Sequence, residues 1–161
     1  MVKPNNLRKV SIARLKQEMQ DTVFLSDDLA ITTIDYLRNP TSEIPVSLDG
    51  FAAMIMMSGS AVRSIDTETY EVRPNMLVFF RPGSIIRTIR CSSDATAYLV
   101  ACSKAFVSDI QVDISASLPI HMRFGRKPCL QVTERDVAEI RQFFQLIKTV
   151  IQSDKERYRK E

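Results

Sequence analysis

The chain has 161 residues, of which 45% are apolar and 25% charged, and its formal net charge is +3. This length suffices for one domain with a core, and the composition excludes a largely disordered chain. The longest apolar run, 51–57, is too short to cross a bilayer, and no secretory signal follows the basic start. The three cysteines lack paired spacing, so we expect reduced thiols in a cytoplasmic protein.

Short predicted strands follow a basic N-terminal arm, 1–20, which holds a predicted helix over 11–19 with Ser11 as its N-cap. Direct DNA binding by this arm is not expected, because its basic residues are not interleaved with aromatic ones and no reader motif accompanies them. Pro and Asn residues at 39–45 indicate a loop. The predicted strands are 22–25, 29–36, 51–58, 61–65, 70–73, 76–81, 84–91 and 96–102. Because they are short, regularly spaced and separated by turns, the range 21–102 is predicted to be an antiparallel sandwich or barrel.

Helices are predicted in the last part of the chain, 103–161. The segment 103–110 is expected to be a short helix and 117–128 an irregular stretch. A long helix begins at Thr133, which forms a predicted capping box with Asp136. Apolar residues then recur three and four apart, as in a heptad seam, at Val137, Ile140, Phe144, Ile147 and Ile151. We expect this seam to form a homodimer interface, with packing on the chain's own core as the alternative. The stripe is wide enough for two surfaces, because a second flank follows at Phe143, Leu146 and Val150.

One stretch of the predicted barrel has a pattern of its own. The residues YEVRPNMLVFFRPGSIIRTIR, 70–90, resemble the second sequence motif of the cupin superfamily, a barrel fold that usually holds a metal. Asn75 stands at the first glycine of that motif, and Ile86 stands where the family has a metal-binding histidine. Counting back from the first turn puts Ala52 at the position of a glutamate ligand. None of these side chains can hold a metal, so the resemblance implies a barrel without a metal or other cofactor.

An enzyme is not expected. The single histidine, His121, has no cysteine, serine or carboxylate at a recognisable catalytic spacing. The chain contains neither a G-x-S-x-G elbow nor a glycine-rich phosphate loop. The cysteines are interpreted as buried or half-buried small apolar residues.

The barrel interior is the predicted site for a small molecule. Alternation along 84–91 places Ile86, Thr88 and Arg90 on the face of the motif's histidine position. Arg90 would need an anion as partner inside an apolar barrel, and its alternative is a side chain that reaches solvent. The predicted ligand-binding residues are Met54, Met56, Phe79, Ile86, Thr88, Arg90 and Tyr98. The alternative for the set is that these residues simply fill the barrel.

The order of barrel and helices resembles the N-terminal sensor domain of AraC-type transcriptional regulators. The likeness is carried by the segments 24–28, 51–59, 64–80, 98–109 and 133–151. It implies a mainly β chain, with a cupin-like antiparallel jelly-roll barrel followed by a helical dimerisation segment. It also implies a small-molecule effector, a homodimer, and control of a C-terminal pair of helix-turn-helix units, through which alone the protein would bind DNA.

Those DNA-binding units are absent from the 161 residues, and the charged tail favours a fragment cut in its linker over a free-standing relative. The basic arm is hypothesised to take part in the switch. Two other functions stay open. One is a stand-alone metal-free cupin-like protein that binds a ligand or acts as a sugar isomerase or epimerase. The other is a dimerisation module without a ligand.

Overall fold

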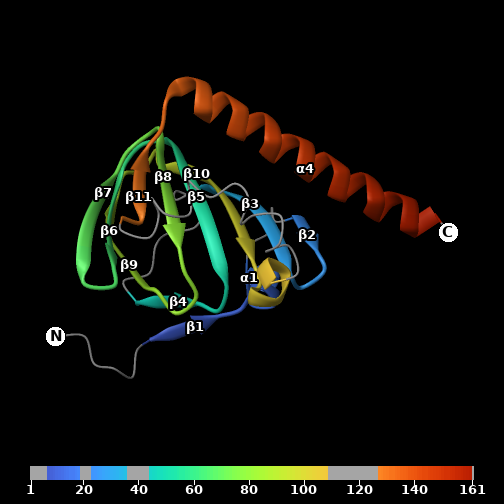
Figure 1. The fold of residues 1–161 in the computed structure, drawn as a ribbon, viewed down its shortest axis with the longest axis horizontal. Helices are drawn as coiled ribbons and strands as arrows, with labels where there is room; N and C mark the ends of the chain where they lie inside the picture. Colours follow the sequence, from blue (N-terminus) through green and yellow to red (C-terminus); the bar gives the residue numbers. More distant parts are fainter. Residues whose placement is uncertain (1–6, 19–22, 36–43, 109–126, 161) are drawn as a thin grey trace.

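Two facing β-sheets form most of the molecule in a computed structural model, which describes residues 7–18, 23–35, 44–108 and 127–160 (Figure 1). The first sheet has the order β1 (Arg8–Val10), β4 (Val46–Leu48), β9 (Ile85–Cys91), β6 (Ala61–Ile65) and β7 (Glu68–Val72). The second has the order β11 (Cys129–Gln131), β8 (Met76–Phe80), β5 (Phe51–Ser58), β10 (Thr96–Cys102), β3 (Leu29–Asp35) and β2 (Val23–Leu25). Every pair is antiparallel except β1 with β4. This confirms the predicted fold class, a mainly β jelly roll with C-terminal helices.

The turns between strands lie where the sequence predicted them. Asn75 adopts a φ of 65° and Gly83 a φ of 81°, the left-handed conformation that Asn tolerates and glycine favours. Gly59 also has a positive φ, 70°, and a Cβ there would lie 2.6 Å from the Cα of Ala95. These turns end one strand and reverse the chain into the next, which produces the antiparallel order.

Three short strands were not predicted. β1 and β11 lie outside the range 21–102 that the sequence assigned to the barrel, and β4 follows the predicted loop at 39–45 directly. Each has three residues, too few for an alternating pattern to be visible. β1 covers the edge of β4, and β11 extends the second sheet beside β8. The barrel therefore takes in residues from both ends of the described chain.

The interior between the sheets is the main hydrophobic core. Along β6, Ala61, Arg63 and Ile65 are buried while the residues between them are partly exposed, which is the alternation of a strand with one face inward. The inward residues of β5 are buried in the same way. The core cluster comprises Val10, Ile12, Phe24, Ala30, Leu48, Ala52, Met54, Met56, Ala61, Ile65, Val72, Val78, Phe80, Ala95, Ala97 and Ala101.

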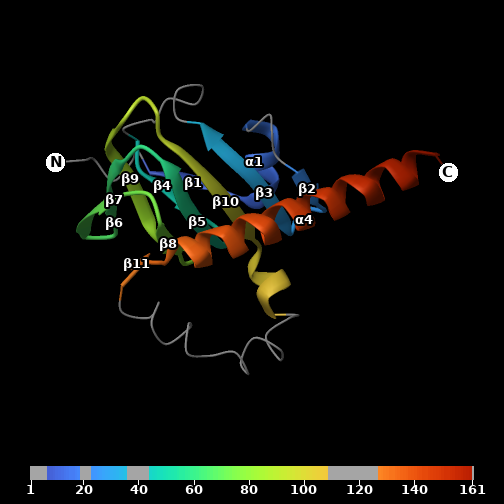
Figure 2. The same ribbon diagram turned by 90° about the horizontal axis from the view of Figure 1, so that it is seen from above.

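The predicted helices are present at both ends of the chain. In α1 (Ile12–Glu18), Ser11 Oγ accepts a hydrogen bond from the amide of Arg14 at 3.2 Å, which confirms the N-cap. Residues 104–108 are helical, inside the predicted helix 103–110. The long helix α4 (Glu134–Lys160) crosses the outside of the second sheet (Figure 2).

The start of α4 is a capping box, as the sequence predicted. The amide of Asp136 donates to Thr133 Oγ1 at 3.1 Å, and the amide of Thr133 donates to Asp136 Oδ2 at 3.0 Å. These hydrogen bonds from Thr133 lower the pKa of the Asp136 carboxyl. The helix thus begins at a fixed residue immediately after β11.

Candidate functional site

Strand β9 carries three of the predicted ligand-binding residues, and its pairing with β6 decides which of them enter the barrel. Ile86 lies opposite Ile65, and Thr88 lies opposite Arg63. Directly paired residues project to the same face of a sheet, and both partners on β6 are buried. Ile86 and Thr88 therefore face the interior, and Ile86 packs against the core cluster.

The expectation that Arg90 faces inward is wrong. A register shift in β6 between Val62 and Arg63 brings Arg90 opposite Val62 and Cys91 opposite Ala61, which is buried. Such a bulge moves the alternation by one residue. Arg90 is consequently exposed, and Cys91 packs against the core in its place.

The guanidinium inside the barrel belongs to Arg63. Its side chain is only 7% exposed, and it lies between the inward residues Ala61 and Ile65 of β6. Burial lowers the pKa of Arg63 from its ordinary value to about 10, because a desolvated site disfavours the charged form. A pKa of about 10 still leaves the group charged at neutral pH. The barrel therefore encloses a positive charge.

The thiols of Cys91 on β9 and Cys129 on β11 lie near the guanidinium. Both oppose the lowering of the pKa of Arg63. Burial raises the pKa of Cys91, and it raises the pKa of Cys129 to about 11, although Arg63 counteracts both shifts. Both thiols are therefore protonated at pH 7 and carry no charge that would neutralise the guanidinium. Both are free and partly buried, which fits their interpretation as small apolar residues.

Tyr70 completes the interior around Arg63, because it lies directly opposite on β7 and packs against the core. Its hydroxyl reaches outward and donates a hydrogen bond to Glu68 Oε2 at 2.8 Å. That hydrogen bond is the main cause that raises the pKa of Tyr70 to about 12. Tyr70 is thus a neutral neighbour of Arg63 at any physiological pH.

Of the predicted methionines and aromatics, only the methionines enter the barrel. Met54 and Met56 are 1% and 0% exposed and belong to the core cluster. Tyr98 instead projects to the outer face of β10 and stacks on Phe144 of α4 with ring centroids 4.4 Å apart. Phe79 projects from one face of β8, whereas the buried Val78 projects from the other. The ring centroids of Phe79 and Phe51 are 6.3 Å apart. The expectation that these two aromatic rings line the interior is therefore wrong, because each has the parity of the outer face.

The heptad seam of α4 is occupied by the chain itself. Val137, Phe144 and Ile151 are 9%, 3% and 5% exposed, and Phe144 and Ile151 form a second cluster with Val23 and Ile31 of the sheet. Ile147 packs against this cluster, and Ile140 is partly buried. The seam thus packs on the chain's own sheet, which is the alternative that the sequence left open, since the outer sheet face is apolar enough to bind it.

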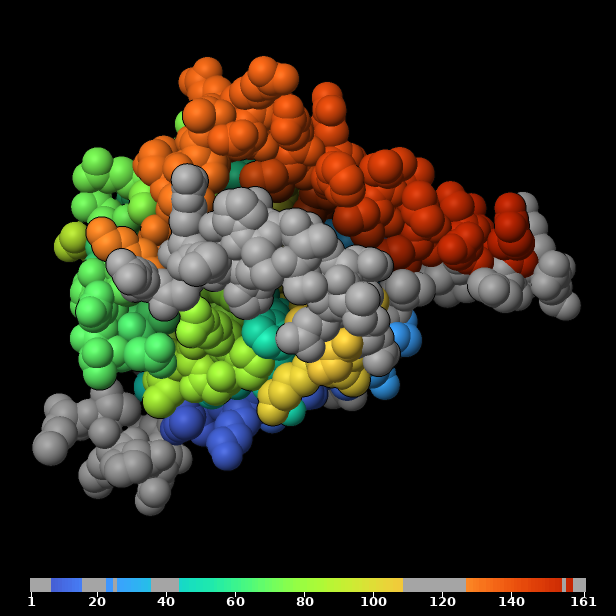
Figure 3. All heavy atoms as spheres, in the orientation of Figure 1, coloured from blue at the N-terminus to red at the C-terminus, as the bar shows by residue number. Residues whose placement is uncertain are grey.

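The second flank of α4 faces solvent. Its three apolar residues are each at least half exposed: Phe143 at 68%, Leu146 at 60% and Val150 at 50%. α4 forms a ridge along one side of the molecule (Figure 3). The helix therefore packs on the sheet through one of the two apolar surfaces that the sequence indicated. The other apolar surface is exposed to solvent.

His121 and the predicted irregular stretch 117–128, apart from its last two residues, lie outside the described residues. Within the described ranges, no group of three or more His, Cys, Asp or Glu side chains is placed to hold a metal ion. No helix among these residues is both long enough and apolar enough to cross a membrane.

Comparison with protein-family models gives no match, and comparison with curated proteins gives none either. Among solved structures, apo ToxT K231A from Vibrio cholerae strain SCE256 is similar with a TM-score of 0.50 and 11% identity over 74% of this chain. This chain covers 47% of ToxT, so it spans about half of that protein. A putative mannose-6-phosphate isomerase from Ralstonia eutropha JMP134 matches with a TM-score of 0.43 and 16% identity, over 52% of this chain and 82% of that one.

A cupin superfamily protein from Desulfitobacterium hafniense DCB-2 matches with a TM-score of 0.39 and 11% identity, over 52% of this chain and 74% of that one. At these identities the likeness is one of fold. The likeness to ToxT, with its TM-score of 0.50, is therefore a likeness of fold alone. The sheet order and the paired strands show a jelly-roll barrel followed by a helix, and the likeness to ToxT supports that fold.

Proposed function

We propose that the chain is the effector-sensing and dimerisation domain of an AraC-type transcriptional regulator, whose metal-free barrel binds a small anionic molecule. The observation that carries the proposal is the guanidinium of Arg63, buried inside an otherwise apolar barrel. A charge in such a place costs stability, because water no longer solvates it. A buried charge of this kind therefore serves a purpose other than stability, and guanidinium groups are best suited to bind anions.

The neighbours of Arg63 suit a ligand with an anionic head and an apolar body. Thr88 lies opposite on β9 and offers a hydroxyl, while Ile86 adds an apolar wall. Met54 and Met56 fill the interior with flexible, unbranched side chains that can move to admit a ligand at small cost. Ligand binding would then shift the chain toward the conformations that bind it better. These five residues are our proposed ligand contacts.

Thermal shift and calorimetric titration test this proposal with pairs of small carboxylic acids and their neutral amides. An acid that binds at Arg63 raises the melting temperature of the wild type, because a ligand stabilises the state it binds. Arg63→Met should abolish the shift, whereas Arg90→Met, which removes an exposed arginine, should retain it. Equal shifts for acid and amide, or a shift that survives Arg63→Met, would contradict an anion site at Arg63.

Assembly in this proposal uses the second flank of α4 instead of the predicted seam. Phe143, Leu146 and Val150 recur three and four apart, so they form one stripe on the open side of the helix. A stripe of this kind is buried when it packs on the same helix of a second copy. Sedimentation of Leu146→Glu against Gln145→Glu tests it, because Gln145 is exposed but does not belong to the stripe. We expect a monomer for the first and a dimer for the wild type and the control; a wild-type monomer at every concentration would contradict it.

The regulator assignment has a separate test in the native gene. An open reading frame that continues beyond the codon for Glu161 into two helix-turn-helix units would support it, and a stop codon there would favour a stand-alone cupin-like protein.

The dimerisation module without a ligand is a second candidate, and it is favoured by the full burial of Met54 and Met56 in a packed core. A screen in which no compound shifts the melting temperature, together with an intact dimer, would support this candidate over the sensor.

A further inference from the structure

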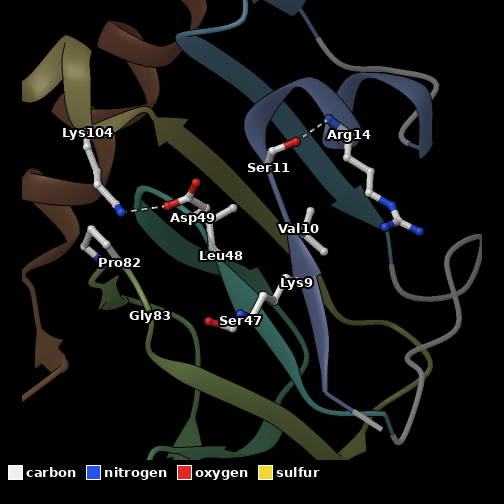
Figure 4. Close-up of a pocket in the computed structure, with 10 residues that line it drawn as sticks. All are labelled: Lys9, Val10, Ser11, Arg14, Ser47, Leu48, Asp49, Pro82, Gly83 and Lys104. Carbon is white, nitrogen blue, oxygen red and sulfur yellow. Dashed lines mark hydrogen bonds and ion pairs between the residues drawn. The ribbon is translucent and has the colours of Figure 1, made fainter. Parts of the chain in front are cut away.

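A pocket of about 560 Å³ lies on the side of the barrel where β1 covers β4 (Figure 4). Its walls come from β1 and the start of α1, from the end of β4, from the turn at 82–83 and from the residue that begins the helical segment 104–108. The residues that line it are Lys9, Val10, Ser11, Arg14, Ser47, Leu48, Asp49, Pro82, Gly83 and Lys104. None of these residues is one of the five proposed ligand contacts of the barrel interior.

Hydrogen bonds hold the walls of this pocket in place. The amide of Asp49 donates to the carbonyl of Val10 at 2.8 Å, which ties the end of β4 to β1. The amide of Gly83 donates to the carbonyl of Leu48 at 3.1 Å, which fixes the turn against the same strand. Val10 and Leu48 are 3% and 7% exposed and form an apolar floor. The pocket is therefore preformed.

The charge of the lining is positive. Lys9, Arg14 and Lys104 contribute three positive charges and Asp49 one negative charge, so the ten described lining residues carry +2. Lys104 Nζ lies 2.9 Å from Asp49 Oδ1, and both side chains are well exposed. An exposed ion pair of this kind contributes little, so it does not commit Lys104 to Asp49. Three cations from three separate elements thus surround one preformed hollow.

We propose that this pocket binds a small organic molecule that carries a phosphate monoester. A phosphate dianion matches the +2 lining, and the volume lies within the range of small-molecule sites. The apolar floor of Val10, Leu48 and Pro82 would contact the organic part of the ligand. This inference goes beyond the proposed effector site, because it concerns a different surface and a different set of cations.

Calorimetric titration with glycerol 3-phosphate, inorganic phosphate and glycerol tests the proposal. Glycerol 3-phosphate should bind more tightly than phosphate, and glycerol should not bind. The affinity should fall as salt is added, because the attraction acts between partly exposed charges. Binding of phosphate as tight as that of glycerol 3-phosphate would contradict an organic ligand, and no binding of either at low salt would overturn the site.

Two variants with opposite charge effects make the test specific. Lys104→Gln should weaken binding of glycerol 3-phosphate about fivefold, the effect of one unit charge at about 4 Å through water. Asp49→Asn should strengthen it by a factor of about two to five, because it removes the repulsive charge. Arg141→Gln is the matched control, since Arg141 is exposed on α4, on the opposite side of the barrel from β1 and β4 (Figure 1). Equal affinities for all four proteins would overturn the proposal.

The outcome is independent of the effector site. Arg63→Met should leave the affinity for glycerol 3-phosphate unchanged, whereas Lys104→Gln should leave the response to carboxylic acids unchanged. Loss of phosphate binding in Arg63→Met would place the phosphate in the barrel and overturn the pocket proposal.

Discussion

Replacing Arg63 by methionine is expected to raise the free energy of unfolding. The lowering of its pKa to about 10 corresponds to about 3 kcal/mol of destabilisation at neutral pH, since one pKa unit is about 1.4 kcal/mol. The unfolded chain binds the proton more tightly than the folded one, so this cost is fully present below about pH 10 and is relieved only as the pH rises from there toward the pKa of the unfolded chain. Methionine has a similar unbranched stem and no charge. We expect a gain of about 1–3 kcal/mol, the range in which apolar replacements of buried charges fall.

Urea denaturation at pH 7, followed by circular dichroism, measures this change. A gain of about 2 kcal/mol would move the midpoint up by about 1 M urea for a typical slope. Arg90→Met is the matched control, because Arg90 is exposed, and its effect should lie within about 0.5 kcal/mol. The reasoning is refuted if Arg63→Met destabilises the protein by more than 1 kcal/mol. A stabilising Arg90→Met would indicate instead that β9 has the regular alternation predicted from the sequence.

Four further predictions concern the turn before β8 and the helix α4. Asn75→Ala should cost about 1 kcal/mol because of the positive φ, and Asn75→Gly should change stability by less than that; equal effects in urea denaturation would contradict the left-handed turn. Thr133→Ala should cost about 1 kcal/mol. Because the pKa of Asp136 is lowered, its contribution is present above the pKa of the unfolded carboxyl and is lost as the pH falls through the folded value. Asp136→Asn should therefore flatten the acid side of the stability profile, and an unchanged profile would exclude that contribution. A double-mutant cycle of Tyr98→Ala and Phe144→Ala should give a coupling of about 0.5–1.5 kcal/mol, and a coupling near zero would contradict docking of α4 on the sheet.

Eight strands and the long helix could be predicted from the sequence because their signals are local. Turn residues such as Asn75 and Gly83 fix where strands end, and the capping box at Thr133 fixes where the helix begins. The pairing of β1 with β4 and of β11 with β8 could not be predicted, because three residues carry no periodic signal and their partners are distant in sequence. Those strands become visible only when the sheets are complete.

The sequence analysis placed the candidate site inside the barrel, but it did not name Arg63, the residue on which the proposed anion site rests. Alternation places Ile86 and Thr88 correctly, because the pairing of β9 with β6 is regular up to that point. The extra residue of the bulge is Ile89 of β9, which has no partner because Arg63 pairs with Thr88 and Val62 with Arg90. Alternation along β9 alone does not show this bulge, so it does not show that Arg90 turns outward. One sequence signal pointed to Arg63 as an inward-facing charged residue. Arg63 follows an apolar residue by two positions and precedes another by two, which places a charged residue on the inward face of β6.

The start of α4 is attached to the barrel at the turn that contains Asn75. Its first turn follows β11 directly, and both the amide of Val132 and the Nε2 of Gln131 donate to the carbonyl of Asn75, at 2.8 and 3.1 Å. From that pivot the helix runs for 27 residues, which is about 40 Å. A rotation of about 10° at the pivot would carry the far end through about 7 Å, because displacement grows with distance along a rigid rod. Because Phe144 and Ile151 pack against Val23 and Ile31, such a rotation requires these contacts to open, so the position of the Asn75 turn is coupled to the packing on the outer face of the second sheet.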